Sequence, residues 1–295
     1  MRARSPACQP MSADSQRTLL GVSLMSLAMF SAAGIDISVK ALTSGFDTPQ
    51  IVLLRSLFAL PVVLLICRYQ SGLRSLATPR WGWQIYRGFL TAGANFGFFY
   101  ALAHVPIVTA LLLSYIGPVL IVLLSRPLLG ERVGLHQWLG ISVAFTGVVV
   151  VLRPDSLYLP PAALAIFGSA LCWALLSISN RRLAGIEPTG VLAFYTVPIS
   201  ALLAGLLTVG EWTAPAGTDW LLFAIAGGCG ASAHLLVAMA YRHANAAVIA
   251  PFEYTALIWI SLAGYLFWSE KPDAFTWLGG AAVIFGGWLA MRSRE

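Results

Sequence analysis

Ten apolar stretches of about 20 residues each follow one another through this chain, with short polar breaks between them. They occupy residues 19–39, 49–67, 85–103, 107–128, 134–152, 161–181, 189–208, 219–241, 246–267 and 274–291. A helix of about 20 mostly apolar residues is long enough to cross the hydrocarbon core of a bilayer. The sequence therefore predicts an all-α integral membrane protein with ten transmembrane helices.

The composition excludes the soluble classes. Of the 295 residues, 58% are hydrophobic and 10% are charged, whereas a soluble domain carries about 25% charged residues. The net charge of +6 does not indicate a nucleic-acid partner, because the Lys and Arg residues are scattered between apolar stretches and form no basic stripe. The four cysteines lack the spacing of a metal site. We therefore expect no metal, no cofactor and no nucleic acid.

The distribution of positive residues predicts the orientation in the membrane. With a cytoplasmic N-terminus, fourteen Lys and Arg residues fall in cytoplasmic segments, and only Lys40, Arg153 and Lys271 fall outside. Positive residues are enriched in cytoplasmic loops. We expect a bacterial inner-membrane protein with both termini in the cytoplasm. Residues 1–18 are expected to form a flexible tail, and both Met1 and Met11 remain candidate start sites.

An internal repeat divides the chain into two halves. A shift of 139 residues aligns 100–153 with 239–292 and gives eleven identical pairs. These include His104/His243, Tyr115/Tyr254, Glu131/Glu270, Trp138/Trp277, Gly140/Gly279 and Gly147/Gly286. With a two-residue gap, residues 37–42 align with 178–183. The unit is five spans, 19–153 and 161–291, and five is odd. The two copies therefore enter the membrane from opposite sides, as in many secondary transporters, although some channels also have inverted repeats.

One segment of the first half resembles a known family. It runs from Ala101-Leu102-Ala103-His104 through Pro118 and Leu129-Gly130-Glu131-Arg132 to Trp138-Leu139-Gly140 and Gly147. This pattern resembles the signature of the EamA-type drug/metabolite transporters, and the second half repeats it more loosely. The resemblance implies a ten-helix basket whose central cavity opens to one side at a time. It also implies transport of amino acids, purines, drugs or other metabolites, most often outward.

The second half departs from that pattern beside a charged residue. Leu257 stands where Pro118 stands in the first half, and the preceding segment reads Ala250-Pro251-Phe252-Glu253-Tyr254. This segment is similar to branches of the family linked to S-adenosylmethionine, riboflavin or amino-acid-derived metallophores. Pro251 lacks a backbone N–H, so it removes one helical hydrogen bond and could expose a carbonyl to substrate.

Three ionisable residues lie at membrane depth. They are Asp36 in the first stretch, Arg55 in the second and Glu253 in the ninth. A charge near the bilayer centre costs about 2.5–3.5 kcal/mol even on insertion scales, so such residues mark pathways. Glu253 could bind a cationic amine or carry a proton. A structural alternative stays open, in which Arg55 pairs with Asp36 or Glu253 to link two helices.

Uncharged polar and aromatic residues complete the expected site. His234 and Asn95 occupy matching positions in the eighth and third stretches, and Ser114 matches Glu253. For His234, a hydrogen-bonded packing role is the alternative. The expected substrate-binding set is Glu253, Tyr254, Tyr100, Asn95, Ser114, Tyr115, His234 and Trp173.

Together these features predict a secondary transporter for a small, amino-acid-derived metabolite: an amino acid, an S-adenosylmethionine-like compound or a metallophore. We expect alternating access, export across the inner membrane, and a proton as candidate coupling ion. A passive facilitator or channel remains an alternative, as does uptake of a vitamin or nucleoside-type compound. An intramembrane enzyme would need clustered histidines or carboxylates at one interface, and the sequence shows none. The sequence does not specify the oligomeric state.

Overall fold

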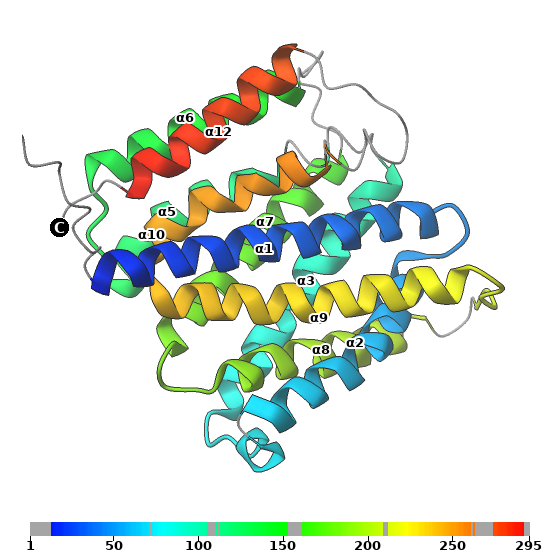
Figure 1. Cartoon of the computed structure of the whole chain (residues 1–295). Helices are drawn as coiled ribbons and strands as arrows, with labels where there is room; N and C mark the ends of the chain where they lie inside the picture. Colours follow the sequence, from blue (N-terminus) through cyan, green and yellow to red (C-terminus); the bar gives the residue numbers. More distant parts are fainter. Residues whose placement is uncertain are drawn as a thin grey trace, which may run out of the picture.

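The computed structural model describes residues 13–70, 72–104, 110, 113–152, 161–208, 212–260, 262 and 274–291. Within these ranges every element longer than an isolated bridge is helical, as expected. The elements are α1 (Ala13–Leu42), α2 (Thr48–Gln70), η1 (Leu73–Leu76), α3 (Trp81–His104), α5 (Ile116–Leu129), α6 (Leu135–Leu152), α7 (Pro161–Leu183), α8 (Thr189–Leu207), α9 (Asp219–His243), α10 (Ala246–Ile249), η2 (Ala250–Thr255) and α12 (Ala274–Met291) (Figure 1).

The helices follow the expected spans with two differences. Helix α1 begins at Ala13, so residues 13–18 of the expected tail are helical. The expected span 246–267 is not one α-helix, because it changes to a 3₁₀ helix at Ala250. Five described helices, α1, α2, α7, α8 and α9, are long and apolar enough to cross a membrane. The expected spans 107–128 and 246–267 extend into residues outside the described ranges.

The helix pairs reflect the inverted repeat. Helix α1 packs along α9, and their counterparts in the other half, α7 and α3, also pack together. Helix α2 packs against α8, and α6 lies beside α12 at the top of Figure 1. Each of these pairs takes one helix from each half. A pseudo-two-fold axis exchanges each helix with its counterpart in the other half, so it relates the α1–α9 pair to the α7–α3 pair. The fold therefore confirms two inverted repeats.

Helices α6 and α12 touch through glycines that the repeat makes equivalent. A Cβ added at Gly140 would lie 2.6 Å from the carbonyl oxygen of Gly286, and one added at Gly286 would lie 2.5 Å from that of Gly140. About two helical turns further along α6, a Cβ added at Gly147 would lie 2.7 Å from the carbonyl oxygen of Gly279. Small residues let helix backbones approach closely in membranes. The identities between the two halves at these positions therefore have a packing reason.

A second pair of equivalent residues meets where α5 approaches η2. The rings of Tyr115 and Tyr254 are 5.5 Å apart in an edge-to-face arrangement. The Tyr254 hydroxyl also donates a hydrogen bond to the Tyr115 carbonyl oxygen over 3.1 Å. Residues that a two-fold axis exchanges can touch only near that axis. These tyrosines therefore place the pseudo-two-fold axis at the centre of the protein, next to Glu253.

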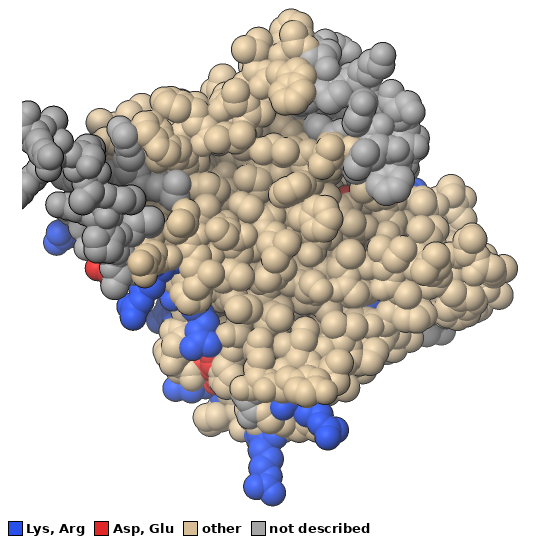
Figure 2. Space-filling model, viewed as in Figure 1, with Lys and Arg blue, Asp and Glu red and all other residues tan. Residues whose placement is uncertain are grey.

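Positive side chains gather at one end of the helices. In Figure 2 the Lys and Arg side chains cluster at the lower left, where α1 begins and where α2 and α9 end. The broad surface between the ends carries almost no charge in this view. This is the pattern of a membrane protein whose apolar sides face lipid.

The glycine contact between α6 and α12 can be tested by adding a single methyl group. We expect Gly140→Ala to destabilise the protein by about 1–3 kcal/mol, because the methyl group meets a backbone carbonyl that cannot move aside. Gly168→Ala is the matched control, since a Cβ there meets nothing within 4 Å. In the control, alanine makes the unfolded chain less flexible than glycine does, so the free energy of unfolding should stay unchanged or rise. The measurement is thermal unfolding in detergent, and equal midpoints for the two variants would contradict the close approach.

Candidate functional site

Glu253 lies at the point where the ninth span changes its helical type. Helix α10 ends at Ile249, and Ala250–Thr255 form the 3₁₀ helix η2, with Pro251 near its start. Proline has no N–H for the α-helical hydrogen-bond ladder, and a 3₁₀ turn is a common local solution. The tighter winding turns the Glu253 side chain into the protein, where it is 4% exposed.

Two donors from two other helices hold the Glu253 carboxylate. The indole N–H of Trp173 in α7 donates to Oε2 over 2.9 Å, and the hydroxyl of Tyr241 in α9 donates to Oε1 over 3.0 Å. Within the described ranges, no basic side chain forms an ion pair with Glu253. A buried carboxylate needs hydrogen bonds or a cation to replace its lost hydration. Here the hydrogen bonds are present, and the cation would have to come from a ligand.

The tyrosines beside Glu253 are packing residues at this site. Tyr254 is fully buried, and its hydroxyl is engaged by the Tyr115 carbonyl oxygen. Tyr115 is also buried, and its own hydroxyl has no hydrogen-bond partner among the described residues. Ser114 is half-buried next to it. The structure thus brings Tyr254, Tyr115 and Ser114 to the central region expected for them.

A second polar cluster surrounds Arg55. Its guanidinium is 6% exposed and lies over the ring of Phe99, 5.2 Å from the ring centroid. Arg55 lines a small cavity of about 10 Å³ with Asn95 and His234, and its Nε has no hydrogen-bond partner among the described residues. Asp36 lies close enough for its charge to act on Arg55, but no ion pair within 4 Å joins them. The expected Arg55–Asp36 link is therefore a longer-range attraction.

One aromatic contact connects the two clusters. The rings of Trp173 and His234 are 6.2 Å apart between centroids. Trp173 also donates to Glu253, and His234 lines the cavity of Arg55. A row of side chains therefore runs from a buried cation at Arg55, past His234 and Trp173, to a buried acid at Glu253. Asn95 lies at the Arg55 end, where its amide donates to Ser200 Oγ over 3.5 Å.

Tyr100 lies in a different place. It is 48% exposed and lines an open pocket of about 750 Å³ together with Thr43, Asp47 and His104. Its ring packs on that of His104, with 4.1 Å between centroids. This pocket is at the opposite end of α3 from the arginine-rich end. The structure does not bring Tyr100 to Glu253.

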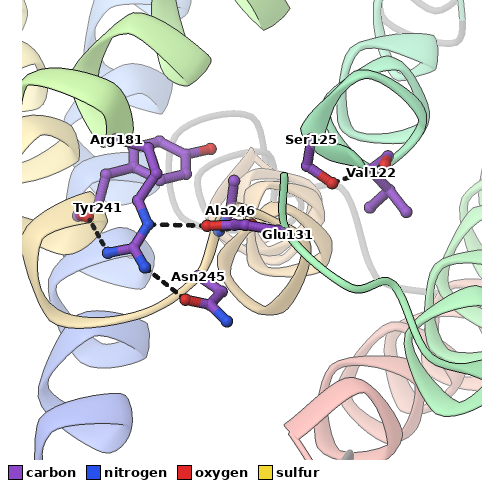
Figure 3. Close-up of polar contacts among 7 residues, drawn as sticks. All are labelled: Val122, Ser125, Glu131, Arg181, Tyr241, Asn245 and Ala246. Atoms are coloured by element: carbon purple, nitrogen blue, oxygen red, sulfur yellow. Dashed lines mark hydrogen bonds and ion pairs between the residues drawn. The ribbon is translucent and has the colours of Figure 1, made fainter. Parts of the chain in front are cut away.

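A polar network at the arginine-rich end joins the two halves (Figure 3). Arg181 Nε, at the end of α7, donates to Glu131 Oε1 over 2.8 Å, and Ala246 N donates to Glu131 Oε2 over 3.0 Å. Arg181 also donates to the Tyr241 carbonyl oxygen over 3.2 Å and to the Asn245 side chain. Glu131 belongs to the first half, and the other four residues belong to the second. We call these five residues the Glu131 network.

Tyr241 takes part in both the network and the site. Its carbonyl oxygen accepts from Arg181, while its hydroxyl donates to Glu253. Glu131 lies between two expected spans and Arg181 at the end of another, and neither was expected at a site. The available signal was the repeat, in which Glu131 aligns with Glu270 and Arg181 aligns with Lys40.

Comparison with known proteins identifies the family. The model of the EamA-like transporter family matches the chain twice, over residues 19–153 and 160–292. The chain belongs to the EamA-like transporter family. The expected resemblance is therefore confirmed, and so is the membrane class of the protein.

The relatives of this transporter carry small metabolites. A pseudopaline exporter of Pseudomonas aeruginosa is 29% identical over 269 residues, which cover 90% of this chain and 93% of the relative. An S-adenosylmethionine uptake transporter of Rickettsia felis is 27% identical and covers 92% of each chain. A riboflavin transporter of Rhizobium johnstonii is 35% identical over 193 residues. That match spans 65% of this chain and 64% of the relative, just under two thirds of its length.

A solved structure agrees with the fold. One crystal structure of a protein superposes with a TM-score of 0.78 at 25% sequence identity, covering 94% of this chain and 96% of the other. The family, the relatives and the fold together show a membrane transporter of small molecules.

The Glu131–Arg181 ion pair makes a quantitative prediction. Glu131→Gln and Arg181→Gln should each lower the free energy of unfolding by about 1–3 kcal/mol, because each leaves a partly buried charge without its partner. The double variant should lose less than the sum, with a coupling energy of about 0.5–3 kcal/mol. Denaturant unfolding in detergent measures this cycle. Arg132→Gln is the control, since Arg132 is exposed and forms no recorded ion pair among the described residues. Strict additivity would contradict the pairing.

Proposed function

We propose that this EamA-type protein exports a small zwitterionic, amino-acid-derived metabolite across the bacterial inner membrane by alternating access. Amino acids, S-adenosylmethionine-like compounds and metallophores share an ammonium group and a carboxylate. The observation that carries the proposal is the row of side chains with Arg55 at one end and Glu253 at the other. Opposite charges at the two ends of one site complement a zwitterion.

Each end of the row carries a charged group that forms no ion pair within 4 Å among the described residues. At the acidic end, the Glu253 oxygens accept only neutral donors, so an ammonium group would supply the missing counter-charge. At the basic end, the Arg55 Nε–H is unused among the described residues, and a guanidinium binds carboxylates with paired hydrogen bonds. His234 and Trp173 between them provide ring faces for the carbon skeleton.

The Glu131 network supplies a mechanism for alternating access. It holds the ends of α7 and α9 and the start of α10 to the first half, which closes this end of the protein. A ligand ammonium at Glu253 competes with the Tyr241 hydroxyl for Oε1. Because the Tyr241 carbonyl accepts from Arg181, displacement of Tyr241 weakens the network and favours opening. Glu253 and His234 are the candidate proton carriers for coupled transport.

The direction of transport is a separate question from the identity of the substrate. The pseudopaline exporter supports export, whereas the S-adenosylmethionine uptake transporter supports import of a nucleoside-type compound. The riboflavin transporter supports a vitamin as substrate without a direction. Proteoliposomes with a pH gradient and labelled substrates separate these choices. Uphill efflux of a zwitterion supports the proposal. Uphill uptake would favour the importer, and equilibration without accumulation would favour a facilitator.

The zwitterion site depends on the charge of Glu253. Glu253→Gln should cut the transport rate at least about tenfold, equivalent to about 1.4 kcal/mol, because the ammonium loses its counter-charge while the side-chain shape is kept. The measurement is the initial rate of labelled substrate transport in proteoliposomes. Asp14→Asn is the matched control, an exposed acid outside the site that should retain the wild-type rate. A well-folded Glu253→Gln protein with wild-type rates would overturn the proposed site.

A further inference from the structure

A groove on the outer face of the protein lies at the arginine-rich end of the helices. It is formed by the start of α3, the end of α7 and the end of α5, and its volume is about 430 Å³. Its lining includes Arg80, Trp83, Tyr86, Leu128, Leu175 and Arg182. The transport site around Glu253 shares none of these residues, so the groove needs an explanation of its own.

Two guanidinium groups stand at the mouth of the groove. Arg182 is exposed, and its guanidinium lies over the Trp83 ring at 5.2 Å from the centroid. Arg80 is half-exposed and lies 3.3 Å from the Glu187 carboxylate, which also accepts a hydrogen bond from Thr78. Both cations are thus held in position while part of each faces outward.

The remainder of the groove is apolar. Tyr86 and Leu128 are exposed, and Leu175 is half-exposed between them and the helix core. Gly82 also lines the groove, and a Cβ added there would meet no atom within 4 Å. Cations at one end and an open apolar surface at the other match a molecule with a charged head and a hydrocarbon tail.

A third cation, which unlike the other two is buried, adds to the positive charge behind the groove. Arg87 is 1% exposed and donates hydrogen bonds to Ser179, Asn180, Gln84 and the Leu192 carbonyl oxygen, all of them uncharged. Ser179 itself lines the groove. Of Arg80, Arg87 and Arg182, only Arg80 forms an ion pair among the described residues, with Glu187. The local excess of positive charge favours an anionic ligand.

We propose that this groove binds an anionic phospholipid. Its phosphate lies between the Arg80 and Arg182 guanidinium groups, and one acyl chain lies along Tyr86, Leu128 and Leu175. Basic pockets between transmembrane helices at the cytoplasmic face are known to accept anionic headgroups, and aromatic residues such as Trp83 belong at this depth of the bilayer. The bound lipid links α3 of the first half to α7 of the second.

The test is the shift of the thermal unfolding midpoint when lipid is titrated into the detergent-solubilised, full-length protein. Ligands that bind only the folded state raise its apparent stability. We expect dioleoylphosphatidylglycerol to raise the midpoint more than dioleoylphosphatidylcholine, which has the same chains but no net charge. Glycerol 3-phosphate should give no shift. An equal shift with glycerol 3-phosphate would assign the site to soluble phosphates and overturn the proposal.

Variants locate the effect. Arg182→Gln should weaken phosphatidylglycerol binding about fivefold, and the further change Arg80→Gln about fivefold again, as expected for the loss of one lipid-facing cation each. Arg68→Gln is the control, an exposed arginine at the same end outside the groove. Gly82→Leu should block the lipid by filling the groove, whereas Gly168→Leu, also in open space, should not. Unchanged binding in both Arg182→Gln and Gly82→Leu would overturn the proposal.

Discussion

A carboxylate inside a membrane protein must replace its lost hydration, at a cost of several kcal/mol if it fails to do so. Glu253 replaces it with the Trp173 indole N–H and the Tyr241 hydroxyl. These donors belong to α7 and α9, while Glu253 lies on η2, so this one carboxylate sets how three spans of the second half meet. Its two hydrogen bonds hold the Tyr241 hydroxyl and the Trp173 indole, and the Trp173 ring in turn lies beside His234.

The frame of the protein is symmetric and its site is not. Equivalent residues meet at the centre, where Tyr115 contacts Tyr254, and equivalent contacts join α6 to α12, where Gly140 meets Gly286 and Gly147 meets Gly279. In contrast, Glu253 of the second half corresponds to Ser114 of the first. A symmetric frame allows two conformations of similar energy. Because the two halves present different side chains at this site, a ligand would interact differently with each conformation. A ligand shifts an equilibrium only through such a difference.

Much of the fold followed from the sequence, but the site followed only in part. Hydropathy gives the depth of a residue in the membrane, and the repeat gives the relation between the halves. The direction in which a side chain points around its helix is harder to predict, because helices buried in lipid and protein are apolar on every face. Tyr100 was therefore expected among the substrate-binding residues, yet it lines a pocket away from Glu253. Glu131 and Arg181 lie 50 residues apart near helix ends, and no sequence pattern indicated the ion pair that the structure shows between them.

The glycine contact between α6 and α12 also decides which parts of the molecule can move. Where two backbones touch through facing carbonyls, neither helix can slide or roll without a steric clash. One helix comes from each half, so α6 and α12 form a rigid pair that connects the two halves. Distances between spectroscopic labels on α6 and α12 would then stay constant through a transport cycle and serve as an internal reference. Relative to the α6–α12 pair, the displacement of the other helices can be measured without assuming which half is stationary.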